Sequence, residues 1–267
     1  MFKKLLFIIT LVYSLLISGC GKKNISDENT ILIGTIAGPE TELVEIAKVV
    51  AKKQYNLDVH IVPFNDYVEP NRALIEGEID ANMFQHLPYL DHVISSQNYK
   101  LISMGALFIY PMGIYSEKYK KLSDVPYNAI IAIPNDISNQ TRSLLLLEKA
   151  GLIKLKNNNL ANISKNDISD NPKNLILQEV DPAFMVRMLS DLDLAVINTN
   201  YAAMANLLPN RDALFAENKN SRYANILVVR VEDKDQEKFK QLLKALRSPE
   251  VIQKADKLFN GQALAGW

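Results

Sequence analysis

Short apolar segments alternate with amphipathic ones along most of this chain, and this alternation restricts the possible folds more than any other feature of the sequence. Residues 31–35 and 58–62 have the short apolar or alternating pattern of β-strands. Residues 40–55 and 67–76, which follow them, carry apolar side chains at helical spacing. Strands that alternate with helices usually form a parallel sheet covered by helices. The sequence therefore predicts an α/β fold.

A second group of strand and helix patterns occupies the middle of the chain. The expected strands are residues 101–106, 108–115, 129–133, 175–180, 194–197 and 226–231, and the expected helices are residues 138–150, 182–189, 235–246 and 249–259. Ligands of open α/β sheets bind beyond the carboxyl ends of the strands. The loops at residues 134–142 and 198–201, which follow two of these strands, are therefore candidates for a binding site.

The first thirty residues have the pattern of a bacterial lipoprotein signal. Two lysines precede an uncharged apolar stretch, residues 5–17, which is too short to span a bilayer comfortably. Two small residues and then Cys20 follow, as in the lipobox at which lipoproteins are processed. We therefore expect a signal peptide at residues 1–19 and a flexible tether at residues 20–30 that begins with a lipid-modified Cys20, palmitate being among its acyl chains. An uncleaved N-terminal anchor helix is the alternative.

Cysteine count and charge exclude several classes of protein. Cys20 is the only cysteine of the 267 residues, so no disulfide framework is possible within the chain. Thirty basic and thirty acidic side chains give a formal net charge of zero, which lacks the basic excess of a nucleic-acid-binding protein. The sequence thus indicates a membrane-anchored protein of the cell envelope, facing the periplasm or the outer side of the membrane.

No recognisable catalytic or metal-binding motif occurs in the sequence. The only histidines are His60, His86 and His92, and the last two are six residues apart, which fits neither the helical pair of a zinc protease nor a zinc finger. A nucleophile elbow and a complete phosphate-binding loop are also missing. We therefore expect no enzymatic activity, no metal and no cofactor. A lipoprotein hydrolase that uses His86 and Asp91 is the enzymatic alternative.

An aromatic group in the first half of the chain indicates a small-molecule pocket. Phe84, His86 and Tyr89 surround a proline, and Tyr67 precedes them. Flat rings with polar tips suit a ligand with an apolar stem and a polar head. Taken singly, each ring is better explained by a hydrophobic loop that packs on the core.

Two polar residues occur at the candidate loops of the second group. Arg142 follows residues 134–141 and could bind a carboxylate with two hydrogen bonds. Asn198 comes directly after a strand, where its amide could accept from an ammonium group or donate to a carboxylate. Their alternatives are a surface arginine paired with Asp136 or Glu148, and an asparagine that caps the following helix. The residues alone leave both interpretations open.

Longer stretches that contain these residues resemble the NlpA/MetQ family of methionine-binding lipoproteins. The similar stretches extend from the lipobox to the last residue and include residues 64–74, 79–91, 134–136, 142–147, 171–175, 194–199, 259–261 and 266–267. Long matches in the same order are more specific than any single short motif. The chain departs from the family pattern at Ile137, Ser138 and Thr141, where the family often has proline, threonine and glycine.

The resemblance implies a type II periplasmic-binding-protein fold, in which two α/β lobes joined by two crossing segments close over a ligand. The first lobe would contain residues 31–108 and 231–267, and the second would contain residues 109–230. The crossings would lie near residues 108–111 and 226–230. The C-terminal helices would then pack on the first lobe.

The resemblance also implies a function: the substrate-binding component of an ABC importer, which delivers methionine to a permease and its ATPase. Its ligand is expected to be L-methionine, with D-methionine or a methionine-containing dipeptide as variants, and a non-transport adhesin is the remaining alternative. The ligand side chain would lie among Tyr67, Phe84, His86 and Tyr89. Its backbone groups would meet Arg142, Asn198 and Asn225. Asn225 rests on the resemblance alone, because the sequence pattern marks it only as the flank of a strand.

Overall fold

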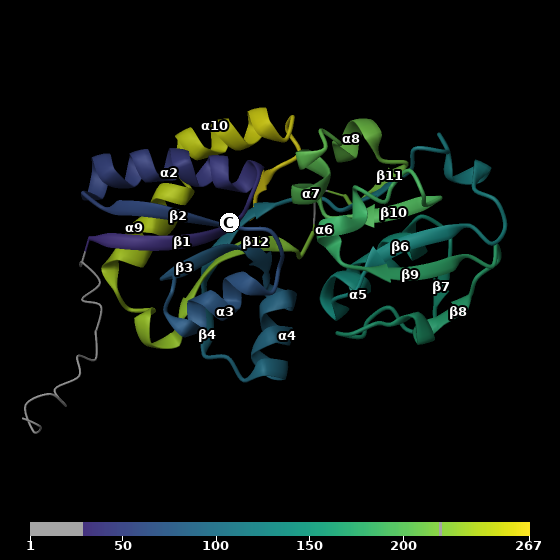
Figure 1. Cartoon of the computed structure of the whole chain (residues 1–267), viewed down its shortest axis with the longest axis horizontal. Helices are drawn as coiled ribbons and strands as arrows, with labels where there is room; N and C mark the ends of the chain where they lie inside the picture. Colours follow the sequence, from purple (N-terminus) through teal and green to yellow (C-terminus); the bar gives the residue numbers. More distant parts are fainter. Residues whose placement is uncertain (1–28, 219–220) are drawn as a thin grey trace, which may run out of the picture.

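Two β-sheets with their own helices lie side by side along the long axis of the molecule (Figure 1). The computed structural model describes residues 29–218 and 221–267. The predicted signal peptide, Cys20 and nearly all of the predicted tether lie outside the described residues. Within them, the structure confirms the predicted α/β architecture of two lobes.

The first sheet has six strands in the order β13-β4-β12-β3-β1-β2. In this order they are Leu264–Ala265, Leu101–Ile109, Ala224–Arg230, Ala81–His86, Thr30–Ile36 and Asp58–Phe64. β1 pairs in parallel with β2 and β3, as the alternation of strands and helices predicts. β12 pairs antiparallel with β3 and β4, so the sheet is mixed.

Five main helices cover the two faces of this sheet. They are α2 (Pro39–Tyr55), α3 (Glu69–Glu76), α4 (Leu87–Gln97), α9 (Glu237–Leu246) and α10 (Pro249–Leu258). Because side chains alternate along a strand, β12 contributes side chains to the hydrophobic cores on both faces of the sheet. Leu227 and Val229 pack with α2, α9 and α10, whereas Ile226 and Val228 pack with α3 and α4. The C-terminal helices thus complete the core of this sheet, as predicted. We call this unit lobe 1.

The second sheet, with its helices, forms lobe 2 and has the order β11-β5-β10-β6-β9. Its strands are Phe215–Ala216, Gly113–Tyr115, Leu194–Ile197, Ile130–Pro134 and Ile176–Val180. Its helices are α5 (Ile137–Lys149), α6 (Pro182–Met185), α7 (Thr199–Met204) and α8 (Pro209–Asp212). β6 pairs in parallel with β9 and β10, and β5 pairs antiparallel with β10 and β11. A small ladder of β7 (Lys154–Leu155) and β8 (Ile168–Asp170) and three single turns, η1 (Leu122–Asp124), η2 (Lys165–Asp167) and η3 (Val231–Asp233), complete the elements.

Two crossover segments join the sheets. The first, residues 110–112, leads from β4 to β5, at the place predicted for a crossing. The second, of which residues 217–218 and 221–223 are described, leads from β11 to β12, so it precedes the predicted position at residues 226–230. Those residues form β12 within the sheet of lobe 1 instead of ending lobe 2. An apolar strand pattern does not say which sheet the strand joins, because that depends on partners far away in sequence.

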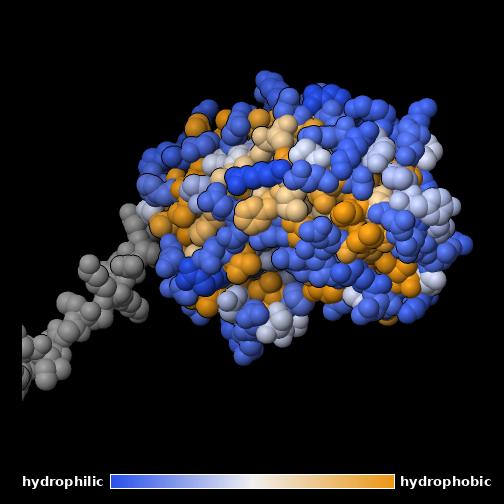
Figure 2. Space-filling view, turned by 45° about the vertical axis from the view of Figure 1, so that its right-hand side comes forward, coloured by the Kyte–Doolittle hydropathy of each residue, from blue (hydrophilic) through white to orange (hydrophobic). Residues whose placement is uncertain are grey.

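The surface gives no sign of a membrane-spanning element in the part of the chain that is described. No helix there is long and apolar enough to cross a membrane. The face shown in Figure 2 is largely hydrophilic, with apolar residues in separate patches. Three exposed apolar residues, Val68, Phe184 and Met204, come from both lobes and line one open groove.

Candidate functional site

A narrow cavity lies between the two lobes, with about 20 Å³ of space for the centre of a water-sized molecule. It is lined by the seven residues predicted to bind ligand, namely Tyr67, Phe84, His86, Tyr89, Arg142, Asn198 and Asn225. Five further residues complete the wall, namely Gln85, Tyr110, Asn139, Thr199 and Asn200. Both candidate loops, residues 134–142 and 198–201, reach this cavity. The structure thus brings together residues that are up to 158 positions apart in sequence.

The segment considered as a possible hydrophobic loop is instead the junction of β3 and α4. β3 is buried along its whole length and ends at His86, which is the N-cap of α4. The Nδ1 atom of His86 accepts a hydrogen bond from the backbone N–H of Tyr89 at 3.3 Å. Pro88 fits in the first turn of α4, where a proline costs no hydrogen bond. The proline therefore starts a helix here and holds Phe84, His86 and Tyr89 around one corner.

Three rings form an aromatic slot at one end of the cavity. The centroids of Tyr67, Phe84 and Tyr89 are 5.9–6.1 Å apart in tilted and edge-on arrangements. The hydroxyl of Tyr89 donates to the backbone oxygen of Tyr67 at 2.8 Å, which fixes the two residues relative to each other. The slot is therefore pre-formed and offers mainly ring faces and edges.

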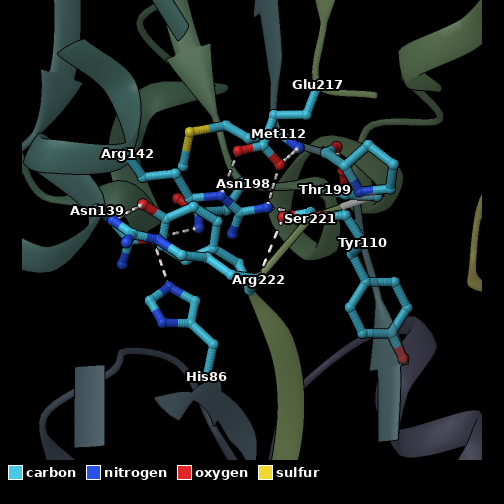
Figure 3. A network of polar contacts seen from close by, with 12 residues as sticks. His86, Tyr110, Met112, Asn139, Arg142, Asn198, Thr199, Glu217, Ser221 and Arg222 are labelled. Atoms are coloured by element: carbon cyan, nitrogen blue, oxygen red, sulfur yellow. Dashed lines mark hydrogen bonds and ion pairs between the residues drawn. The ribbon is translucent and has the colours of Figure 1, made fainter. Parts of the chain in front are cut away.

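A chain of hydrogen bonds that starts at Asp136 orients the polar side chains on the opposite wall. Asp136 is the N-cap of α5 and accepts from the backbone and side-chain N–H groups of Asn139. This contact turns Asn139 Oδ1 toward the cavity, where it accepts from His86 Nε2 at 3.2 Å and from Asn198 Nδ2 at 2.9 Å (Figure 3). Because His86 Nδ1 is already an acceptor, its proton lies on Nε2. The carboxylate of Asp136 thus fixes the side-chain amide of Asn139. Through Asn139 it also fixes the tautomer of His86 and the side-chain amide of Asn198.

Two amide atoms on the cavity wall have no partner among the described residues. Asn198 Oδ1 is buried and accepts no hydrogen bond, while Asn198 is the N-cap of α7 without using its side chain for capping. Asn200 Oδ1 accepts from the Tyr67 hydroxyl at 2.7 Å, and its Nδ2 is left buried and unpaired. Buried polar atoms without partners are costly in a folded protein. On this wall, Asn198 Oδ1 is therefore available to accept a hydrogen bond and Asn200 Nδ2 to donate one.

Arg142 lies in the second turn of α5 and is 4% exposed, so it is not a surface arginine. Its partner is Glu217 in the second crossover, rather than Asp136 or Glu148. Nε donates to Glu217 Oε1 at 2.9 Å, and Nη2 donates to Glu217 Oε2 and to the backbone oxygen of Tyr110 at 2.8 Å (Figure 3). Burial opposes the charge, but Glu217 outweighs it and raises the pKa of Arg142. The arginine is therefore a fixed cation tied to both crossovers.

Thr141, which departs from the family pattern, fits its position without strain. It lies inside α5, where a left-handed backbone is not required. Its hydroxyl donates to the backbone oxygen of Ile163 at 3.2 Å and accepts from the N–H of the same residue at 2.7 Å. The β-branched side chain therefore anchors the loop at residue 163 to α5, and it leaves the guanidinium of Arg142 in place.

Asn225 stands at the start of β12, opposite His86 in β3. Its Nδ2 donates to the backbone oxygen of Phe84 at 3.2 Å and to the carboxyl of Glu40 at 2.7 Å. Both amide hydrogens are thus used inside the protein. Only Oδ1 remains for a ligand, so Asn225 can act toward it as an acceptor.

His86 is unsuited to the acid–base role that a hydrolase would require. Both ring nitrogens are occupied by Tyr89 and Asn139, not by Asp91. Burial, with the nearby charge of Arg142, lowers the pKa of His86 to about 3. The imidazole is therefore neutral at physiological pH and acts as a hydrogen-bonded wall of the cavity.

Sequence patterns missed several residues of this site. Tyr223 packs under the Arg142 guanidinium, with 4.5 Å from Cζ to the ring centroid, and also contacts the His86 ring. Glu217, Asn139 and Asn200 complete the polar contacts described above. A hydrophobic pattern marks none of them. The only sequence signal was position: Asn139 and Asn200 lie within the two candidate loops.

Comparison with known proteins gives consistent results across the folded chain. The NlpA lipoprotein family model matches residues 31–267. The D-methionine-binding lipoprotein MetQ of Salmonella typhi is 46% identical over 268 residues, which cover 100% of this chain and 98% of that protein. Two solved structures are also similar. One, an ABC transporter periplasmic substrate-binding protein from Coxiella burnetii, has 51% identity and a TM-score of 0.86 and covers 88% of this chain and 100% of its own.

The other structure is a nutrient-binding protein from Burkholderia cenocepacia that was solved bound to methionine. It has 48% identity and a TM-score of 0.87, and the match covers 89% of this chain and 100% of that one. The sequence therefore agrees over nearly the full length of all three relatives, and the fold agrees with that of the two solved structures. From the family match over residues 31–267 and these identities, we conclude that the chain belongs to the NlpA lipoprotein family.

Proposed function

We propose that this protein binds methionine between its two lobes and delivers it, as a lipid-anchored component of an ABC importer, to a membrane permease and its ATPase. One observation carries the proposal: one cavity combines an aromatic slot with a buried arginine and two buried amide atoms, Asn198 Oδ1 and Asn200 Nδ2, that have no partner among the described residues. An α-amino acid with an apolar side chain has the matching groups. Relatives named for methionine binding support the same choice of ligand.

The aromatic slot suits an unbranched thioether. A methionine side chain is flexible enough to follow the gap among Tyr67, Phe84 and Tyr89, and sulfur near ring edges gains about 0.3–1.5 kcal/mol. Burying the side chain contributes about 2–3 kcal/mol more. His86 closes the slot as a neutral ring, which avoids placing a charge beside the apolar stem.

The polar end of the cavity suits a zwitterion. Arg142 keeps its Nη1 group free of partners among the described residues, and this group takes the ligand carboxylate. Asn225 Oδ1 accepts from the ammonium group, because both amide hydrogens of Asn225 are already used, and Asn198 Oδ1 accepts as well, because it is buried without a partner among the described residues. Arg142 is balanced by Glu217, so a ligand without net charge suits the site.

Methionine binding is tested by calorimetry and thermal unfolding on protein refolded from denaturant without ligand. We expect L- or D-methionine at one hundred times Kd to stabilise the protein by about 2.7 kcal/mol, because only the folded state binds. The two enantiomers are compared directly, and glutamate serves as a control ligand because its charged side chain does not suit an aromatic slot. No stabilisation by either enantiomer at millimolar concentration would refute the proposal.

Membrane attachment through Cys20 keeps the binding lobes near the permease, because a tether raises their effective concentration there. We expect Cys20→Ala to shift the protein from the membrane fraction to the soluble fraction, since each lost acyl CH₂ removes about 0.8 kcal/mol of membrane affinity. Fractionation of cells followed by intact-mass measurement checks this. Ser26→Ala, a change in the predicted tether, should stay with the membrane. A Cys20→Ala variant that remained membrane-bound would contradict the lipid anchor.

A further inference from the structure

Glu40 is a buried carboxyl group directly behind the cavity wall. It lies in the first turn of α2, after the tight turn at Gly38, whose φ of 131° favours glycine. The side chain is 1% exposed, and no described residue forms an ion pair with it. Its Oε1 accepts from Asn225 Nδ2, while its Oε2 is buried without a hydrogen-bond partner among the described residues. A buried carboxyl group with one unpaired oxygen is energetically costly, so its position behind the cavity needs an explanation.

The Glu40–Asn225 contact decides which atom Asn225 presents to a ligand. The backbone oxygen of Phe84 can only accept, so the atom of Asn225 that contacts it must be Nδ2. The second hydrogen of this group goes to Glu40. Asn225 Oδ1 is thereby held as an acceptor on the cavity wall. A carboxylate at Glu40 polarises this amide, which makes Oδ1 a better acceptor for a cation.

The protonated form of Glu40 is favoured at neutral pH. Burial raises its pKa to about 8, and the hydrogen bond from Asn225 only partly opposes this. The helix N-terminus also favours the charged form. The titratable groups that face Glu40 from other elements are the hydroxyls of Tyr67, Tyr110 and Tyr201, which are also protonated because burial raises their pKa values. Among the described residues, none of the groups that face Glu40 is therefore a cation.

We propose that Glu40 is a specificity-determining residue for the ligand ammonium group: it orients Asn225 and, when a cationic amine binds to Asn225 Oδ1, gives up its proton and becomes the buried countercharge. This inference rests on the proposed binding of an amino acid. Glu40 acts through Asn225 and does not line the cavity. The proton leaves to solvent, and the ammonium group then lies near a buried negative charge at Glu40, while the ligand carboxylate lies at Arg142.

The titration of Glu40 predicts two pH dependences: methionine binding strengthens as pH rises, whereas the stability of the protein without ligand falls. For binding, the proton is released, so the Kd for methionine falls as pH rises toward 8, by up to about tenfold per unit for one full proton. For the empty protein, a pKa above its unfolded value means that the contribution of Glu40 to stability is present below pH 4.5 and is lost as pH rises through about 8. Glu40→Gln, which is neutral at every pH, should remove both effects.

The experiment compares wild type, Glu40→Gln and Glu42→Gln. Glu42 lies on the same helix, is about half exposed and pairs with Lys254, so it is a matched control. Calorimetry of methionine binding between pH 6 and pH 8, in two buffers of different ionisation enthalpy, gives Kd and the number of protons released. We expect methionine binding near pH 7 to release a proton from wild type and from Glu42→Gln but not from Glu40→Gln. At pH 8, Glu40→Gln should bind methionine about tenfold more weakly than wild type.

A second probe, 4-(methylthio)butanoate, lacks the ammonium group but keeps the rest of methionine. Glu40→Gln should change its binding by less than about threefold, because no cation is there to stabilise. If Glu40→Gln weakened the binding of methionine and of 4-(methylthio)butanoate equally, Glu40 would act only as a structural support. This result would overturn the inference. Unchanged affinity and unchanged proton release for methionine would overturn it as well. If wild type itself binds no methionine, the proposed function fails, which is a different outcome from either of these.

Discussion

Replacing Arg142 with glutamine should abolish useful methionine binding, with Kd raised between about thirtyfold and several thousandfold. Truncating one member of a buried, hydrogen-bonded charge pair typically costs 2–5 kcal/mol of binding free energy. The variant also leaves Glu217 nearly buried without its cation, which should lower the free energy of unfolding by about 3–5 kcal/mol. Calorimetry at low temperature and denaturant unfolding measure the two effects separately.

Two further variants separate folding from binding in this prediction. In the double variant Arg142→Gln, Glu217→Gln no buried charge is left unpaired, so most of the stability should return while methionine binding stays lost. Arg211→Gln removes an exposed arginine that pairs with Asp212 and should change neither property. A single Arg142→Gln variant that folds and keeps wild-type affinity would show that the guanidinium does not hold the ligand carboxylate.

Replacing Phe239 with alanine should lower the free energy of unfolding by about 3–5 kcal/mol. Phe239 lies on α9 and is 1% exposed in the core that α2, α9 and α10 share with the sheet of lobe 1. Removing its ring deletes apolar contacts and leaves a cavity that the neighbouring helices cannot fill. In a chain of this size the loss corresponds to a fall in Tm of roughly 6–20 °C.

Urea unfolding and calorimetry measure this effect, and Val49→Ala provides the control. Val49 is on α2, but its side chain is 65% exposed, so its truncation should change stability by less than about 0.5 kcal/mol. A Phe239→Ala variant as stable as wild type would mean that the C-terminal helices are not part of the core of lobe 1.

Local patterns predicted most elements because their causes are local. α2 illustrates this: a proline and two acidic residues begin it, two lysines end it, and Asn56 caps it in a left-handed conformation. The junction of β3 and α4 was harder to predict from the sequence. β3 is buried on both faces and therefore lacks the alternation of apolar and polar residues that marks a half-exposed strand. β12 was found as a strand but assigned to the other lobe, because sheet membership depends on β3 and β4.

The sequence by itself determined the α/β class, the family and seven of the side chains that line the cavity, with Asn225 resting on the family resemblance alone, because strand and helix periodicities and long ordered motifs are present along the chain. The tertiary structure alone decided how those side chains are oriented. Glu217 is the partner of Arg142 from 75 residues away, and Glu40 holds Asn225 from 185 residues away. Such partners follow from the packing of two lobes and two crossovers, since hydrogen bonds depend on distance in space and not on separation in sequence.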